Sequence, residues 1–300
     1  MKKQKIRIAI VGLGNIGRYA VEAVEASPDC EVAGIVRRRI GAVAAEYQQY
    51  KQVCDIGELE AVDVALLSQP SRCVPQTAAE LLARGFRTVD SFDIHGEIPS
   101  LRKKLDAVAR AHQTVAILSS GWDPGSDSVV RTLMQAMLPQ GITYTNFGPG
   151  MSMGHSVAAK AIDGVRDALS MTIPLGTSLH RRMVYVELEE GYTIQDVAAR
   201  IKADDYFAHD ETHVMAVRSI AELKDMGHAV DMSRKGVSGR THNQLLQFNM
   251  QINNPALTAQ ILVASARAAM RMQPGAYTLP EVAPIDLLAG DRDEWIGLLV

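Results

Sequence analysis

The chain has 300 residues, enough for two domains of ordinary size, and its 47% hydrophobic content is enough to bury two cores. Its formal net charge is -3, and the 31 basic and 34 acidic residues are scattered, which argues against a nucleic-acid-binding surface. No run approaches the roughly 20 apolar residues of a membrane helix, and Cys30, Cys54 and Cys73 lack the spacing of a zinc site or a disulfide framework. We therefore expect a cytoplasmic protein with no metal site.

The first 120 or so residues alternate short apolar runs with helical periodicity, which is typical of a parallel sheet covered by helices. Strands are predicted at 6–11, 31–36, 63–68, 87–92 and 114–119, with a weaker one at 52–54. Helices are predicted at 16–26, 74–83 and 98–111, and Gly85 marks the end of the second of these. Residues 1–121 are therefore predicted to form a Rossmann-type domain.

After Trp122 the pattern changes. Longer alternating runs at 183–188 and 245–252 predict half-buried antiparallel strands, and so a second domain over residues 122–253. Residues 255–272 follow Asn254, a good N-cap, and predict a long helix that packs back with the rest of 254–300 against the first domain. The predicted fold class is α/β, a Rossmann-type parallel-sheet domain plus a smaller α+β domain with a mostly antiparallel sheet.

Gly12, Gly14 and Gly17 have the GxGxxG spacing between a predicted strand and a predicted helix. Gly12 permits a tight turn, Gly14 lets the backbone approach a pyrophosphate, and Gly17 lets helix and strand pack closely. The helix N-terminus attracts the negative charge. This segment predicts a dinucleotide-binding site.

The end of the second strand discriminates between the nicotinamide cofactors. An NAD enzyme usually carries an acidic residue there, whereas this chain has Arg37, followed by Arg38 and Arg39. A guanidinium can bind a 2′-phosphate through two hydrogen bonds, so the sequence favours NADP. The alternative is a solvated basic turn.

Carboxylates follow the fourth and fifth strands, in the segments 90–95 and 121–125. Ligands of open parallel sheets lie beyond the carboxyl ends of the strands, and paired carboxylates there would suit a substrate ammonium group. Two alternatives stay open. Asp123 could cap a helix with Pro124 as its first residue, and Asp90 could be a satisfied carboxylate at a strand end.

The second domain has a glycine-rich segment, 147–155, which is either a binding loop or a plain connector. Arg181 and Arg182 open a strand, and one of them could clamp a carboxylate while the other faces solvent. The four histidines His155, His180, His228 and His242 lack the spacing of a metal motif and are expected to be structural.

The segments GLGNIG, VDSFDIHGEIP, SSGWDPGSDS, TNFGPGMSMGHS and INNPALTAQ together resemble the meso-diaminopimelate dehydrogenase family through nearly the whole chain. Some members carry an insertion before the strand near His180. This chain lacks it and so resembles a shorter subgroup, some of which also accept 2-oxo acids and make D-amino acids. The resemblance implies NADP-dependent, reversible oxidative deamination of the D-centre of meso-2,6-diaminopimelate to L-2-amino-6-oxopimelate and ammonia, by a homodimer whose second domain binds substrate and forms the dimer.

The resemblance also implies the roles of individual residues, without identifying a single general base. Asp93 and Asp123 match the carboxylates that bind the reacting amino group. The pocket lining is matched by Trp122, Phe147, Met153 and His155, and the site for the distal L-centre by Thr172, Arg182, His228 and Asn254. NADP contacts are matched by Gly12, Gly14, Asn15, Ile16, Arg37 and Arg38. Two other hypotheses are a broad D-amino-acid dehydrogenase and a non-catalytic NADP sensor.

Overall fold

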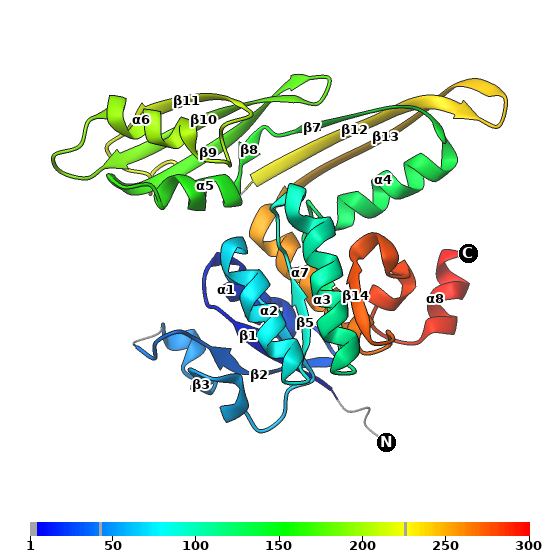
Figure 1. Cartoon of the computed structure of the whole chain (residues 1–300). Helices are drawn as coiled ribbons and strands as arrows, with labels where there is room; N and C mark the ends of the chain where they lie inside the picture. The colour runs from blue at the N-terminus through cyan, green and yellow to red at the C-terminus, as the bar shows by residue number, and fades with distance from the viewer. Residues whose placement is uncertain (1–4, 42–43, 225–226) are drawn as a thin grey trace. The chain divides into compact units, whose positions relative to one another are not determined.

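The computed structural model describes residues 5–41, 44–224 and 227–300. The chain forms two compact units, Met1–Val129 with Pro255–Val300, and Val130–Asn254 (Figure 1). It leaves the first unit within helix α4 (Ser126–Met137) and returns at the start of helix α7 (Asn254–Ala269). The boundaries predicted from the sequence, after residues 121 and 253, lie shortly before these two points.

A seven-stranded parallel sheet forms the centre of the first unit, in the order β14-β6-β5-β4-β1-β2-β3. The strands are β1 (Ile6–Val11), β2 (Cys30–Val36), β3 (Gln52–Val53), β4 (Val64–Leu67), β5 (Arg87–Asp90), β6 (Val115–Leu118) and β14 (Gly275–Thr278). The five predicted strands and the weaker one, β3, are confirmed within a few residues at their ends. The seventh, β14, was not predicted, because four residues with only two of them buried carry no apolar run.

Alternation along the buried strands explains how both faces of this sheet are covered. Ile8 and Ile10 of β1 pack on one face with α1 (Asn15–Glu25) and α7, whereas Ala9 and Val11 pack on the other with α2 (Val74–Ala83) and α3 (Ile98–Ala111). The predicted bounds of α2 and α3 are confirmed, and Gly85, with φ +85°, follows the end of α2 as expected. Rossmann-type topology is therefore confirmed.

Helix α7 belongs to the core of the first unit although it follows the second unit in sequence. Its Leu262 and Val263 are fully buried among residues of β1 and α1. Arg267 of α7, itself buried, donates from Nε to Asp29 just before β2, at 2.8 and 3.0 Å. The helix begins at Asn254, so this residue is its first residue rather than the cap before it, and it ends at Ala269 rather than at residue 272.

Shorter elements complete the first unit. They are the 3-10 helices η1 (Ala45–Tyr47), η2 (Ile56–Glu58), η3 (Ser71–Cys73), η4 (His95–Glu97), η5 (Leu279–Glu281) and η6 (Pro284–Leu287), and helix α8 (Arg292–Leu299). None of the helices in the described part of the chain is long and apolar enough to cross a membrane.

The second unit contains two sheets, β11-β10-β9-β8 and β13-β12-β7. Its strands are β7 (Gln140–Phe147), β8 (Gly150–Met151), β9 (Val165–Gly176), β10 (Leu179–Leu188), β11 (Glu211–Ala216), β12 (Gly227–Ser238) and β13 (Thr241–Asn253). All neighbouring pairs are antiparallel except β10 with β11. Helices α5 (Met153–Lys160) and α6 (Ile194–Ala203) pack on the four-stranded sheet through a core that includes Val184, Val186 and Val197. The predicted α+β unit with a mostly antiparallel sheet is confirmed.

Candidate functional site

The turn between β1 and α1 depends on its glycines. Gly12 has φ +101°, a conformation that other residues rarely adopt, and a Cβ on Gly17 would lie 2.2 Å from the carbonyl oxygen of Gly12. A Cβ on Gly14 would meet nothing within 4 Å, and Gly14 is exposed. Gly12 and Gly17 are thus required by the fold, whereas Gly14 keeps the backbone accessible to a ligand.

The N-terminus of α1 suits an anion. Gly14 precedes the helix and offers no side-chain cap, and the first turn, beginning with Asn15 and Ile16, contains no acidic residue. The N–H groups of this turn have no intrahelical acceptor, and the helix dipole places partial positive charge at this end. A pyrophosphate would satisfy both the N–H groups and the dipole.

Arg37 directly follows β2 and is held at the sheet edge. Its Nη1 donates to the carbonyl oxygen of Gly41 at 3.2 Å and to Oε1 of Gln52 in β3 at 2.9 Å. Arg37 is half-buried and Arg38 is exposed. The turn therefore presents guanidinium groups and no carboxylate at the position where a 2′-phosphate is expected, so these residues fit a phosphorylated dinucleotide.

Two carboxylates lie at the carboxyl ends of the neighbouring strands β5 and β6. Asp93 follows β5, and its Oδ1 accepts from Oγ of Ser71 at 2.5 Å while its N–H donates back to that hydroxyl at 3.3 Å. Asp123 follows β6, and its Oδ2 lies 4.0 Å from Nε2 of His95, with the Asp123 side chain 12% exposed. Both segments thus belong to the same edge of the sheet as the glycine turn after β1.

The helix-cap alternative for Asp123 is wrong. Helix α4 begins at Ser126, so Pro124 lies before the helix and is not its first residue. The segment 121–125 instead forms a compact turn, in which Gly121 donates to the carbonyl oxygen of Pro124 and Ser126 donates to that of Gly121, both at 3.0 Å. Trp122 is 5% exposed in this turn.

Asp90, the last residue of β5, is fully buried. Its Oδ1 accepts from the N–H of Phe92 at 2.9 Å and from the N–H of Ser119 at 3.1 Å. Burial raises the pKa of this carboxyl to about 6, although the two N–H donors act in the opposite direction. The expected strand-end carboxylate is therefore only partly satisfied, because its other oxygen, Oδ2, is buried and has no hydrogen-bond partner among the described residues.

In the second unit, neighbouring strands bring Thr172, Arg182 and His228 into one region. Thr172 faces Arg182 across the β9–β10 pair, and Nη1 of Arg182 donates to Oγ1 of Thr172. Thr172 also faces Gly150 of β8, and a Cβ on Gly150 would lie 2.6 Å from Nδ1 of His228. The absence of a side chain at Gly150 therefore lets β8 lie against His228 of β12.

The remaining residues predicted for the substrate pocket lie close to these strands in sequence. Phe147 ends β7, and its N–H donates to Nε2 of His180 at 2.8 Å. His155, in α5, has its Nδ1 2.8 Å from Oγ of Ser152, and its ring contacts the rings of Tyr206 and Phe207 edge-on. Met153 begins α5 and Asn254 begins α7.

The predicted site residues thus fall into two groups, one in each unit. The first unit holds Gly12, Gly14, Asn15, Ile16, Gly17, Arg37, Arg38, Asp93, Trp122 and Asp123, and the second holds Phe147, Met153, His155, Thr172, Arg182, His228 and Asn254. Arg181 and Arg182 lie in different environments, as expected from the sequence. Arg181 pairs with Glu211 at the exposed edge, whereas Arg182 is mostly buried, although the strand opens at Leu179 rather than at Arg181.

Sequence reasoning missed several partners of these residues. Ser71 holds Asp93, His95 faces Asp123, and Asp210 accepts from Nε of Arg182 at 2.6 Å. Only His95 had a signal in the sequence, because it lies in the same short segment as Asp93. Among the described residues, no group of three or more His, Cys, Asp or Glu side chains is placed to hold a metal ion.

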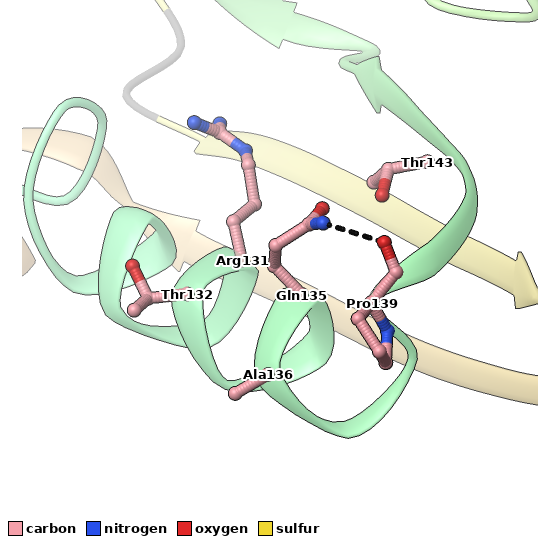
Figure 2. A pocket seen from close by; sticks show the side chains of 6 residues that line it. All are labelled: Arg131, Thr132, Gln135, Ala136, Pro139 and Thr143. Carbon is pink, nitrogen blue, oxygen red and sulfur yellow. Dashed lines mark hydrogen bonds between the residues drawn. The ribbon is translucent and has the colours of Figure 1, made fainter. Parts of the chain in front are cut away.

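A separate hollow on the second unit is lined by Arg131, Thr132, Gln135, Ala136, Pro139 and Thr143 (Figure 2). Within it, Nε2 of Gln135 donates to the carbonyl oxygen of Pro139 at 3.1 Å. The Arg131 guanidinium lies 5.7 Å from the centre of the Phe147 ring. None of the predicted site residues lines this hollow.

Comparison with known proteins finds relatives over nearly the whole chain. Residues 121–254 match the family model of the diaminopimelic acid dehydrogenase C-terminal domain. The chain is 63% identical to the meso-diaminopimelate D-dehydrogenase of Bacteroides fragilis over 299 residues, covering 99% of this chain and 100% of that protein. Two solved structures each align with 99% of this chain and 100% of their own. One, the DAP dehydrogenase of C. glutamicum in complex with DAP, has a TM-score of 0.89 and 30% identity. The other, an engineered D-amino acid dehydrogenase bound to NADP+, has a TM-score of 0.90 and 29% identity.

Proposed function

The chain belongs to the meso-diaminopimelate D-dehydrogenase family, and we propose that it catalyses the reversible, NADP-dependent oxidative deamination of meso-2,6-diaminopimelate. In this reaction the D-configured centre, water and NADP+ give L-2-amino-6-oxopimelate, ammonia, NADPH and a proton. The observation that carries the proposal is the position of Asp93 and Asp123 after adjacent strands of the sheet that also carries the glycine turn. An amine held by these carboxylates would lie at the cofactor edge of the sheet.

NADP is the cofactor that the first unit fits. The turn Gly12–Gly17 and the N-terminus of α1 would hold the pyrophosphate, and Arg37 and Arg38 the 2′-phosphate. When bound, NADP+ supplies the acceptor for the hydride that leaves the α-carbon. The chain itself supplies the orientation of the substrate and the handling of its protons.

The two carboxylates have the chemistry to prepare the amine. An amino group must lose a proton before its α-carbon can lose a hydride, and a nearby carboxylate can accept that proton and then orient the water that attacks the imine. Ser71 fixes the direction of Asp93, and Trp122 is mostly buried next to Asp123 in the turn 121–125. In the second unit, Phe147, Met153 and His155 are the residues that we propose as further substrate contacts.

The distal L-centre would be recognised by the second unit. Arg182 can bind its carboxylate, with Thr172, His228 and Asn254 as further polar partners. An enzyme that binds the distal carboxylate and amine would discriminate strongly against an amino acid with no distal group, because the buried polar residues of the second unit would then stay unpaired.

The test is NADPH formation, followed by absorbance at alkaline pH with purified protein and NADP+. Separate reactions would contain meso-, LL- or DD-diaminopimelate, D-alanine or L-alanine. Strong preference for the meso isomer is expected. A higher specificity constant for D-alanine would instead establish the broad D-amino-acid dehydrogenase, which the likeness to the engineered enzyme favours. Binding of NADPH with no turnover of any substrate would leave only the non-catalytic sensor.

We further infer a cytoplasmic homodimer. On one face of the three-stranded sheet, Ile142 and Leu245 flank Lys235 and are 60% and 57% exposed, as expected for a surface that a second copy covers. The free thiols of Cys54 and Cys73 are exposed, which suits a reducing compartment. Light scattering after size-exclusion chromatography tests the dimer. A monomer at micromolar concentration would refute it, and cell fractionation tests the location.

A further inference from the structure

We propose that Asp90 is a positioning residue, which holds the two segments that carry Asp93 and Asp123 at their working separation. The inference rests on the proposed function of those two carboxylates. Asp90 itself is fully buried at the end of β5 and is therefore shielded from the solvent-exposed edge at which a substrate would bind.

The backbone ladder between β5 and β6 ends just before the two segments begin. Its paired residues are Thr88 with Ala116 and Val89 with Ile117. Beyond the last pair the regular register of the ladder ends. Asp90 is the next residue of β5 after that pair.

Asp90 accepts three hydrogen bonds at this point, one at its backbone carbonyl and two at its side chain. Its carbonyl oxygen accepts from the N–H of Ser120 at 2.7 Å, and its Oδ1 accepts from the N–H of Ser119. The same Oδ1 accepts from the N–H of Phe92, which closes a tight turn in its own segment. One carboxylate oxygen thus joins the residue before Asp93 to the strand end that leads into Trp122 and Asp123.

Ser119, which donates to Asp90, has an unusual backbone conformation. This residue has φ 54°, in the left-handed region that residues other than glycine rarely adopt. The hydrogen bond from its N–H to Asp90 helps to hold it there. Without that acceptor we expect Ser119 to relax and the turn 121–125, which carries Asp123, to move with it. Since misplacement of a reacting group by about 1 Å can cost on the order of 100-fold in rate, small movements at this point matter.

The role needs an acceptor atom at Oδ1 and does not need a negative charge. Asp90→Asn keeps the acceptor, because the amide oxygen can receive both N–H groups. Asp90→Ala removes the acceptor. Asp90→Ser leaves a hydroxyl that is too short to reach both donors. The serine variant is included because it keeps a polar group at this position if the alanine variant fails to fold. Thr88→Val is the matched control, because Thr88 lies on the same strand, is equally buried, and its Oγ1 has no hydrogen-bond partner among the described residues.

The experiment compares these variants with wild type in kcat and KM for meso-diaminopimelate, with active sites counted by NADPH binding. For Asp90→Ser and Asp90→Ala we expect kcat per NADPH site to fall on the order of 10- to 100-fold, with the Kd for NADPH unchanged. Asp90→Asn and Thr88→Val are expected to stay within about threefold of wild type, since neither loses the acceptor.

Two results would overturn the proposal. One is kcat within about threefold of wild type for Asp90→Ser, and the other is an Asp90→Asn variant as impaired as Asp90→Ala, because a charge would then be required. Hydrogen exchange of the segments 91–95 and 119–123 gives a readout that is independent of turnover. Exchange in these segments should accelerate in Asp90→Ser and not in Asp90→Asn. Because this measurement needs no turnover, an inactive wild-type enzyme would refute the proposed function and still leave the role of Asp90 testable.

Discussion

Arg182 donates from Nε to Asp210 at 2.6 Å and from Nη1 to Thr172, so two edges of its guanidinium are already committed within the second unit. The side chains of Arg182 and Asp210 are 14% and 26% exposed. A guanidinium held in this way has lost much of its rotamer freedom before a ligand arrives, and its remaining N–H groups have a defined direction. This arrangement is expected of a guanidinium that binds a substrate carboxylate in one defined position.

Replacement of Arg182 by Met should therefore act on the distal end of the substrate. We expect kcat/KM for meso-diaminopimelate to fall on the order of 100-fold, since one partner of a buried charged contact is lost, whereas oxidation of D-alanine should change much less. Arg181→Met is the control, because Arg181 is the neighbouring residue and forms an exposed pair with Glu211. Equal losses for both substrates would contradict the assignment.

Asp93→Asn and Asp123→Asn should each lower kcat by about 100-fold or more, because an amide cannot accept the proton of the amine. NADPH binding, followed by its fluorescence, should be unchanged. Glu97→Gln serves as the control, since Glu97 is an exposed carboxylate a few residues beyond Asp93. If both variants keep kcat within about threefold of wild type, these carboxylates do not take part in the chemistry.

Arg37→Asp should reverse the cofactor preference. A carboxylate repels the 2′-phosphate and can bind a ribose hydroxyl, so kcat/KM for NADP+ should fall by about 100-fold, which corresponds to about 2.7 kcal/mol. The value for NAD+ should stay the same or rise, which also shows that the variant is folded. Arg39→Ala, in the same turn, is expected to leave the ratio unchanged. A parallel loss with both cofactors would mean that Arg37 supports only the loop.

The buried Asp90 predicts a pH dependence of stability. Its pKa is raised by burial from 3.8 to about 6, so between these values the folded protein keeps a proton that the unfolded chain releases. The stabilisation is full below pH 3.8 and is lost as the pH rises through about 6. Two pKa units correspond to about 3 kcal/mol, which wild type should lose relative to Asp90→Asn between pH 4 and pH 7.

Urea unfolding at several pH values measures this difference. Both tryptophans of the chain, Trp122 and Trp295, lie in the first unit, so their fluorescence reports the unit that contains Asp90. Thr88→Val should differ from wild type by a constant amount over the same range. A constant difference for Asp90→Asn as well would show that Asp90 titrates at its ordinary pKa.

The first unit was largely predictable because its strands are short, continuous apolar runs separated by amphipathic helices, and both signals are local. Val64–Leu67 and Val115–Leu118, for example, are buried at every position, and apolar runs of that length favour buried strands. Strand β14 was not predicted, because Gly275–Thr278 is a strand only through its pairing with β6. Its position depends on residues more than 150 places earlier in the chain.

The positions of site residues could be predicted from the sequence, whereas the partners that orient them could not. The positions of Asp93 and Asp123 follow from where two strands end, which the sequence shows. The partners that orient the site residues do not follow in this way. Asp210 meets Arg182 only because β11 runs parallel beside β10, and Ser71 meets Asp93 only because β4 and β5 are neighbours. Such contacts come from the order of strands in a sheet, which no local pattern encodes.

Helix α7 and strand β14 have a consequence for synthesis on the ribosome. The core of the first unit includes Leu262 and Val263, and its sheet is complete only with Gly275–Thr278. These segments emerge only after the whole of Val130–Asn254. The second unit can therefore close while the nascent chain is still attached. Most of the dinucleotide-binding unit is translated before it, but that unit must wait for α7 and β14 before it can reach its native state.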